Sequence, residues 1–184
     1  MDIKNIIEAA LFAANEPLSI AEIQDLFLLE DRPDKHRVRE AFVQLTRDYV
    51  EKPIELVETA SGYRFQVKSS YSPWVARLWE EKPVKYSRAL LETLAIIAYQ
   101  QPATRGEIEE IRGVSVSTNI IRTLQEREWI RVIGHKEVPG RPALYATTKD
   151  FLDYFNLQTL ADLPPLASLL DMDLSVSGDT QLNL

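Results

Sequence analysis

The 184-residue chain has no cysteine and only two histidines, His36 and His135. Without cysteine it can form no disulfide, iron–sulfur cluster or zinc–thiolate site, and it has no cysteine nucleophile. The two histidines lie 99 positions apart, with no cysteine nearby to complete a ligand set. We therefore expect neither a metal centre nor a cofactor.

Long apolar runs are also missing. The longest apolar stretch, Leu90–Tyr99, is interrupted by Glu92 and Thr93 and is shorter than the roughly 20 residues that span a bilayer. The chain begins Met-Asp-Ile-Lys, with Glu8 soon after, whereas a signal peptide has a basic start and an uncharged core. These features predict a cytoplasmic protein that does not associate with membranes.

Catalytic motifs are absent as well. The six glycines are scattered and form no phosphate-binding loop, and the chain has neither a G-x-S-x-G nor an H-E-x-x-H sequence. Glu107, Glu109 and Glu110 cluster on one predicted helix, where the simplest interpretation is a solvated face near the positive end of the helix dipole. No residues form a nucleophile, base and orienting group, so we expect a protein that is not an enzyme.

The charge distribution separates the end of the chain from the rest. The whole chain has a formal net charge of −7, which argues against wholesale neutralisation of nucleic-acid phosphates. Residues 161–184 contain four aspartates, two consecutive prolines and no basic residue. Low hydrophobicity combined with charge of one sign predicts an acidic, disordered C-terminal tail.

An internal repeat appears when the sequence is shifted by 85 residues. The apolar segment 10–13 aligns with 95–98, and each copy is followed by a proline. Ser-Ile-Ala-Glu at 19–22 then aligns with Thr-Arg-Gly-Glu at 104–107. Both tetrapeptides are capping boxes, in which the hydroxyl accepts from the N3 amide and the glutamate accepts from the N-cap amide. The alternative is two unrelated caps, and the elements that follow decide between them.

The same order of elements follows each cap. In the first copy, a short helix to Phe27 and a helix near 33–50 precede two alternating strands, 54–59 and 63–67. In the second copy, the corresponding elements are helices at 107–111 and 115–127 and strands at 129–133 and 143–147. A helix with Trp74 and Trp79 closes the first copy, and Thr148–Phe155 closes the second.

Three helices followed by a two-stranded hairpin are the order of a winged-helix domain. We therefore predict a mainly α, α+β chain with small β-hairpins, built from two tandem winged-helix domains. The expected boundaries are 1–82 for the first domain, 83–160 for the second and 161–184 for the tail.

Winged helices bind either DNA or proteins, and the residues leave both open. In the second domain Arg122 and Arg127 are offset by nearby glutamates, as is Arg141 in the hairpin loop. A sequence-specific DNA reader usually carries a clearer basic stripe. Aromatic residues gather at the hairpins and closing helices, as at many protein interfaces, although small cores need aromatics too. A winged-helix transcription regulator remains the alternative to an interaction module.

Several segments resemble the segregation and condensation protein B (ScpB) family over roughly residues 3–166. The resemblance is densest in the second half, in the segments Leu90–Pro102, Ile111–Val114, Val138–Thr148, Phe151–Phe155 and Leu160–Leu166, and the N-terminal Ile7–Ala13 also matches. Two positions depart from the family pattern. His135 stands where arginine is expected, and Asn156 stands where glycine is expected, which puts a tight turn after the last helix in doubt.

The resemblance implies a non-enzymatic adaptor of a bacterial SMC–ScpA–ScpB complex, acting in chromosome condensation and segregation during cell division. It implies a homodimer formed through the first domain, and binding to the kleisin ScpA. The SMC ATPase and chromosomal DNA would be reached only through that complex. It also implies a nucleoid-associated location.

The candidate interaction residues are chosen on that basis. For kleisin binding we predict the rigid hairpin loop of the second domain and the exposed side of its third helix, through Arg141, Tyr145, Arg122 and Asn119. For dimerisation we predict the exposed face of the first hairpin and the helix after it, through Tyr63, Arg64, Phe65, Trp74 and Trp79.

Overall fold

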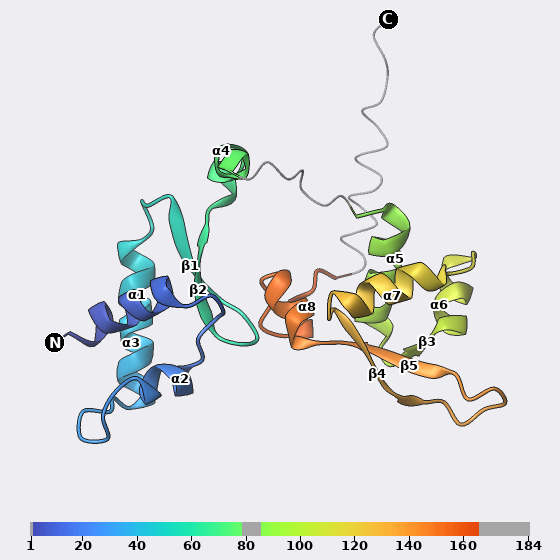
Figure 1. Cartoon of the computed structure of the whole chain (residues 1–184), viewed down its shortest axis with the longest axis horizontal. Coiled ribbons are helices and arrows are strands. Elements are labelled where there is room, and N and C mark those ends of the chain that lie inside the picture. The colour runs from blue at the N-terminus through green and yellow to red at the C-terminus, as the bar shows by residue number, and fades with distance from the viewer. Residues whose placement is uncertain (1, 79–85, 166–184) are drawn as a thin grey trace, which may run out of the picture.

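The computed structural model describes residues 2–78 and 86–165, which form two modules in sequence (Figure 1). We call residues 2–78 the N-module and residues 86–165 the C-module. The N-module contains α1 (Ile3–Ala13), α2 (Ile20–Asp25), α3 (Lys35–Asp48), β1 (Ile54–Glu58), β2 (Tyr63–Val67), α4 (Ser72–Val75) and 3-10 turns at Ser69–Tyr71 and Ala76–Leu78. Its two strands pair antiparallel, from Ile54 opposite Val67 to Glu58 opposite Tyr63.

The C-module repeats this order with an added strand. It contains α5 (Arg88–Gln100), β3 (Ala103–Thr104), α6 (Arg105–Arg112), α7 (Thr118–Glu126), β4 (Ile130–His135), β5 (Ala143–Thr147), α8 (Lys149–Tyr154) and a 3-10 turn at Leu160–Asp162. Its sheet has the order β3-β5-β4, with a bulge between Val132 and Gly134. The predicted combination of helices with small antiparallel hairpins is confirmed.

Both predicted capping boxes are present. Ser19 accepts from the Glu22 amide at 3.2 Å, and the Glu22 carboxylate accepts from the Ser19 amide at 2.8 Å. At the start of α6, the amide of Thr104 donates to the Glu107 carboxylate at 2.7 Å. Each box satisfies backbone donors that would otherwise lack partners at a helix start.

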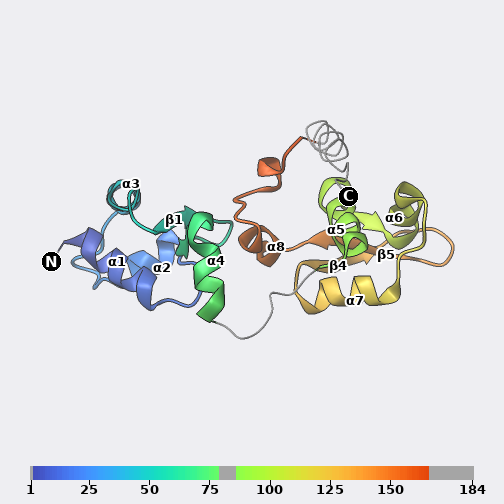
Figure 2. The same ribbon diagram turned by 90° about the horizontal axis from the view of Figure 1, so that it is seen from above.

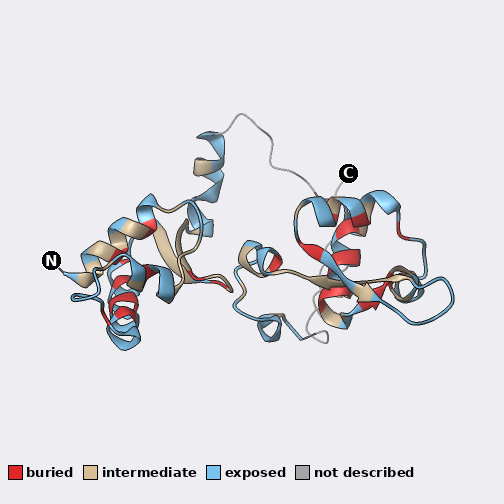
Figure 3. Ribbon diagram, turned by 60° about the horizontal axis from the view of Figure 1, so that its bottom comes forward, coloured by how far each residue is buried: buried red, intermediate tan, exposed pale blue. Residues whose placement is uncertain are grey.

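Each module has its own hydrophobic core, visible as two separate groups of buried residues (Figure 3). The N-module core is built from α1, α2 and α3, with Ile7, Ile23, Val38 and Leu45 fully buried. The C-module core is built from α5, α6, α7, the sheet and α8, with Ile97, Ile108, Val116 and Leu124 fully buried. Neither core includes a residue of the other module.

The modules lie side by side, with α8 on the side of the C-module that faces the first hairpin (Figures 1 and 2). Viewed from above, the N-module helices and the C-module helices form distinct groups. Across the described ranges, no helix is both long enough and apolar enough to cross a membrane.

Part of the predicted tail differs from expectation. Residues 161–165 belong to the ordered C-module, because Leu163 packs against its core and the Tyr99 hydroxyl donates to the Pro164 carbonyl at 2.5 Å. These apolar residues are local exceptions to the acidic composition of the segment. The remainder of the predicted tail, residues 166–184, lies outside the described residues.

Candidate protein-interaction surfaces

The loop between β4 and β5 presents Arg141 in a fixed turn. Gly140 and Arg141 both have positive φ, 86° and 37°. The Arg141 amide donates to the Val138 carbonyl at 2.9 Å, and the Lys136 amide donates to the Pro142 carbonyl at the same distance. The Arg141 guanidinium remains largely exposed while pairing with Glu137 at 2.7 Å. The side chain is thus presented to solvent by an ordered backbone.

The other predicted kleisin-binding residues lie on two further elements. Tyr145 is on the central strand β5, opposite Ala103 and Val132, and is half-buried against the C-module core. Asn119 and Arg122 are exposed on α7. The structure therefore distributes the four predicted residues over a loop, a strand and a helix instead of gathering them into one cluster.

Most basic side chains of the C-module are engaged by carboxylates. The pairs are Arg88–Glu92 at 2.8 Å, Arg105–Glu109 at 3.0 Å, Arg112–Glu92 at 3.3 Å, Arg122–Glu126 at 2.7 Å, Lys136–Glu107 at 2.6 Å and Arg141–Glu137 at 2.7 Å. Arg127 instead lies over the rings of Tyr86 and Trp129. DNA affinity depends on cations that displace counterions from phosphates, so this pairing disfavours the DNA-reader alternative.

Glu107 links the second capping box to β4–β5. Its carboxylate accepts from Lys136, from the Thr104 amide and from the Thr104 hydroxyl. These interactions, led by the Lys136 hydrogen bond, lower the pKa of Glu107 to about 2 from the ordinary 4.5. The carboxylate expected to be merely solvated therefore fixes the base of the hairpin to α6.

The low pKa of Glu107 predicts an acid-sensitive contribution to stability. Because the pKa is lower in the folded than in the unfolded state, the stabilisation is present above pH 4.5 and is lost as the pH falls towards 2. We expect Glu107→Gln, which retains capping-box geometry, to show a smaller fall in Tm over this range than the unsubstituted chain. Because the Glu107 carboxylate is solvent-exposed, its contribution to the free energy of unfolding should be about 1 kcal/mol or less.

Thermal melts followed by circular dichroism at a series of pH values would measure this contribution. Glu110→Gln, which removes one carboxylate from an exposed position on the same helix, is the matched control. Equal pH slopes for Glu107→Gln and the unsubstituted chain would contradict the assignment.

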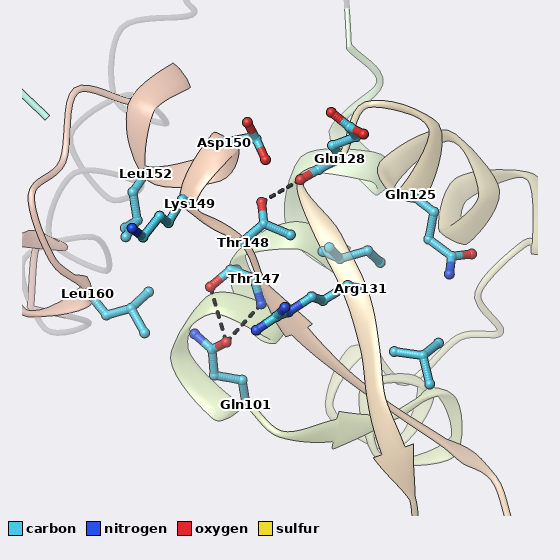
Figure 4. A pocket seen from close by; sticks show the side chains of 12 residues that line it. Gln101, Gln125, Glu128, Arg131, Thr147, Thr148, Lys149, Asp150, Leu152 and Leu160 are labelled. Atoms are coloured by element: carbon cyan, nitrogen blue, oxygen red, sulfur yellow. Dashed lines mark hydrogen bonds between the residues drawn. The ribbon is translucent and has the colours of Figure 1, made fainter. Parts of the chain in front are cut away.

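An open groove of about 820 Å³ runs between the C-module sheet and the start of α8 (Figure 4). Leu152 and Leu160 lie on one side, and Arg131 and Gln125 lie on the other. At its base the Gln101 side-chain oxygen accepts from the Thr147 amide at 2.8 Å. The lining mixes polar and apolar groups but contains no nucleophile–base pair, so it suits a bound chain segment better than catalysis.

A second groove, on the C-module, is apolar and was not predicted from the sequence. It encloses about 310 Å³ and is lined by Leu91, Ala95, Ala98, Tyr99, Phe151, Phe155, Leu157, Leu163 and Pro164. Leu91 and Phe155 are both partly exposed within it. The signal was available on α5, where Leu91 and Ala95 are four residues apart and off the buried stripe. Its other wall comes from residues about 60 positions later in the chain, and the periodicity of one helix does not show which distant segment packs beside it.

In the N-module, the prediction that Tyr63 and Phe65 lie on the exposed face of the first hairpin is wrong. The Tyr63 ring stacks on Phe42 at 3.7 Å between centroids, and the Phe65 ring stacks on Phe12 at 4.7 Å. Both side chains pack on the N-module core because they occupy alternate positions of β2 that face the helices. Arg64, between them, points the other way and contacts the C-module.

The remaining predicted dimerisation residues lie after β2. Trp74 on α4 is 65% exposed, together with exposed Tyr71 and Leu78. Trp79 lies outside the described residues. Leu28 and Leu29, between α2 and α3, were not predicted as contact residues but are 78% and 86% exposed. Two leucines followed by acidic residues and a proline, outside any helical repeat, were the available signal for an exposed apolar loop.

Within residues 2–78 and 86–165, no group of three or more histidine and acidic side chains is arranged to hold a metal ion.

Comparisons with known proteins point to one family. The family model described as "Segregation and condensation complex subunit ScpB" matches residues 5–166. "Segregation and condensation protein B homolog" of Coxiella burnetii is 54% identical over 170 residues, covering 92% of this chain and 81% of that protein.

Two solved structures are also similar. ScpB from Mycobacterium tuberculosis is 29% identical with a TM-score of 0.39, covering 84% of this chain and 95% of that chain. A structure described as a dimer of the ScpB N-terminal domain complexed with ScpA peptide is 26% identical, with a TM-score of 0.38. It covers 45% of this chain and 96% of that chain.

Proposed function

Because the chain belongs to the ScpB family of segregation and condensation complex subunits, we propose that it is a non-enzymatic adaptor of an SMC–ScpA–ScpB complex. In that role it acts in chromosome condensation and segregation and is associated with the nucleoid. The observation that carries the proposal is the family match over residues 5–166, which spans both modules. Grooves and exposed apolar side chains support binding as the mode of action.

The proposed architecture is two winged-helix domains in tandem, residues 1–82 and 83–160, followed by the acidic segment to 184. The repeated order of three helices and a hairpin supports this assignment. The first domain is the proposed homodimerisation domain, with exposed Trp74 as its best-placed candidate contact. Tyr63 and Phe65 contribute by supporting the fold of that domain, since both pack on its core.

The proposed partner is ScpA, which is also the peptide bound in the N-terminal-domain structure described above. In that structure the peptide is bound to an N-terminal-domain dimer. On the C-module, we propose an additional kleisin contact through Arg141 in the loop, Tyr145 on β5, and Asn119 and Arg122 on α7. SMC and DNA are reached through ScpA. The alternative of a DNA-binding regulator is not favoured, because the basic groups of α7 and the loop are paired with carboxylates.

Light-scattering mass tests this function directly. The full chain should have twice the 21.0 kDa monomer mass, and should gain the mass of a ScpA middle segment on mixing. No gain in mass would contradict ScpA as the partner. DNA binding would then be the next test, with a DNA reader losing about 10³-fold or more in affinity between roughly 50 and 200 mM salt.

The same titration tests the proposed contact residues. Arg141→Glu combined with Tyr145→Ala should weaken ScpA binding at least about tenfold, equivalent to about 1.4 kcal/mol. Arg88→Glu, a charge reversal of an exposed arginine on α5, is the matched control and should bind normally. Unchanged affinity for the double variant, with a native circular dichroism spectrum, would move the binding surface elsewhere on the chain.

A further inference from the structure

The turn of the first hairpin contacts the end of α8, although the two segments are about 90 residues apart in the chain (Figure 1). The Ala60 amide donates to the Leu157 carbonyl at 3.0 Å, and the Ser61 amide donates to the Asp153 carboxylate at 2.9 Å. Two backbone donors of the N-module are thereby satisfied by the C-module.

Arg64 adds a second set of contacts at the same place. Its Nη2 donates to the Asp153 carbonyl at 3.0 Å and to the Asn156 side-chain oxygen at 2.8 Å. Beside it, the side-chain amide of Gln158 donates to the Glu58 carboxylate at 3.4 Å. Charge-assisted hydrogen bonds such as those of Arg64 are stronger than neutral ones and more directional.

The N-module side of this contact is held rigidly before the C-module meets it. The Thr59 amide and hydroxyl both donate to the Gly62 carbonyl, at 2.7 and 3.1 Å, which closes the turn. Tyr63 exchanges two backbone hydrogen bonds with Leu18, each 2.9 Å long. The turn is therefore fixed on both sides and presents Ser61 and Arg64 in one position.

The C-module side is equally well defined. α8 is capped by Thr148 and anchored by buried Phe151. It ends where Asn156 adopts a left-handed conformation with φ of 56°, and the Leu157 amide returns to the Leu152 carbonyl at 2.8 Å. Asparagine tolerates this backbone geometry, as glycine would, but only asparagine supplies an acceptor to Arg64.

We propose that the hairpin turn (residues 58–64) and the end of α8 (residues 153–158) form a polar clasp that holds the two modules in one arrangement. The contact is made by hydrogen bonds, while the two hydrophobic cores stay separate. Domains move relative to one another unless the interface between them is large and hydrophobic, so the clasp can open without exposing either core.

The clasp gives Arg64 a role different from the predicted dimer contact. A dimer residue would change the mass when removed, whereas a clasp residue would change the distance between the modules. Arg64→Ala separates these outcomes because it removes both guanidinium contacts. Asn156→Gly is the subtler variant, since glycine keeps the left-handed backbone and removes only the side-chain acceptor.

Pulsed electron paramagnetic resonance on the full chain can measure the distance between the modules. The chain has no cysteine, so Gln44→Cys and Glu110→Cys, both at exposed helix positions, carry the only spin labels. Excess unlabelled chain suppresses distances between copies. We expect a single narrow distance peak for the otherwise unsubstituted chain, and loss of that peak in both Arg64→Ala and Asn156→Gly.

Arg37→Ala, a change of an exposed arginine on α3, is the matched control and should retain the peak. Circular dichroism establishes that each variant is folded, and light scattering reports whether the copies still associate. The proposal is overturned if the unsubstituted chain already shows a broad distribution. It is equally overturned if the peak survives in both Arg64→Ala and Asn156→Gly. A loss of mass in Arg64→Ala with an unchanged distance peak would show that Arg64 is a dimer contact.

Discussion

Gly62→Ala is expected to destabilise the N-module by about 2–4 kcal/mol, because the new methyl group has no space and the backbone is strained. A Cβ at this position would lie 2.3 Å from the Leu18 carbonyl carbon and oxygen, and 2.6 Å from the Ser19 nitrogen. These are backbone atoms held by the bridge between Leu18 and Tyr63, so they cannot move aside cheaply. Gly62 also has φ of 151°, a region that side chains rarely adopt.

Urea unfolding followed by circular dichroism measures this loss. Gly106→Ala is the matched control, because Gly106 is inside α6 and a Cβ there meets no atom within 4 Å. The same substitution should therefore stabilise the C-module by roughly 0.5–1 kcal/mol through helix propensity. If both alanine variants changed the free energy of unfolding equally, the hairpin turn would not lie as close to Leu18 as described.

Leu45→Ala is expected to destabilise the N-module by about 2–5 kcal/mol while leaving the C-module transition in place. Leu45 is fully buried in the core that α3 shares with α1 and α2, and its truncation leaves a cavity there. Trp129 is buried in the other core, so its fluorescence reports C-module unfolding. In a Trp74→Phe, Trp79→Phe background, the circular dichroism transition should move and the Trp129 emission transition should not.

The reciprocal variant provides the control. Leu124→Ala, fully buried in the C-module core, should move the Trp129 transition by a similar amount. A Leu45→Ala variant that shifted both transitions equally would show that the modules unfold as one unit. The two hydrophobic cores would then not unfold independently, although they share no residue.

Local signals in the sequence predicted most of the fold. The capping boxes placed the starts of α2 and α6, and alternation placed β2 and β5 at their observed bounds. The helix expected at 115–127 begins only at Thr118, because Ser117 is its N-cap. Strand β3 was missed, since two residues carry no periodic pattern and are defined only by pairing with β5.

The candidate surfaces were less predictable because they depend on contacts between distant segments. The pair Arg122–Glu126 follows from helical spacing, but Lys136–Glu107 joins residues 29 positions apart. Alternation along β2 puts Tyr63 and Phe65 on one face of the strand. The enrichment of aromatics at interfaces led to the prediction that this face is exposed, whereas it packs on the N-module core. Arg64 was expected at a dimer contact, whereas its described acceptors, Asp153 and Asn156, come from the C-module.

The placement of the hairpin turn has a consequence for the order in which the protein is made. All residues of the N-module core precede residue 66, whereas the groups that Ser61 and Arg64 contact begin at Asp153. At about 5–20 residues per second, the ribosome needs roughly 5–20 s to add the intervening segment. During that interval the N-module can fold on its own, with the Arg64 guanidinium still in water. The contact between the hairpin turn and α8 therefore forms late in synthesis, only after the ribosome has made the chain as far as α8.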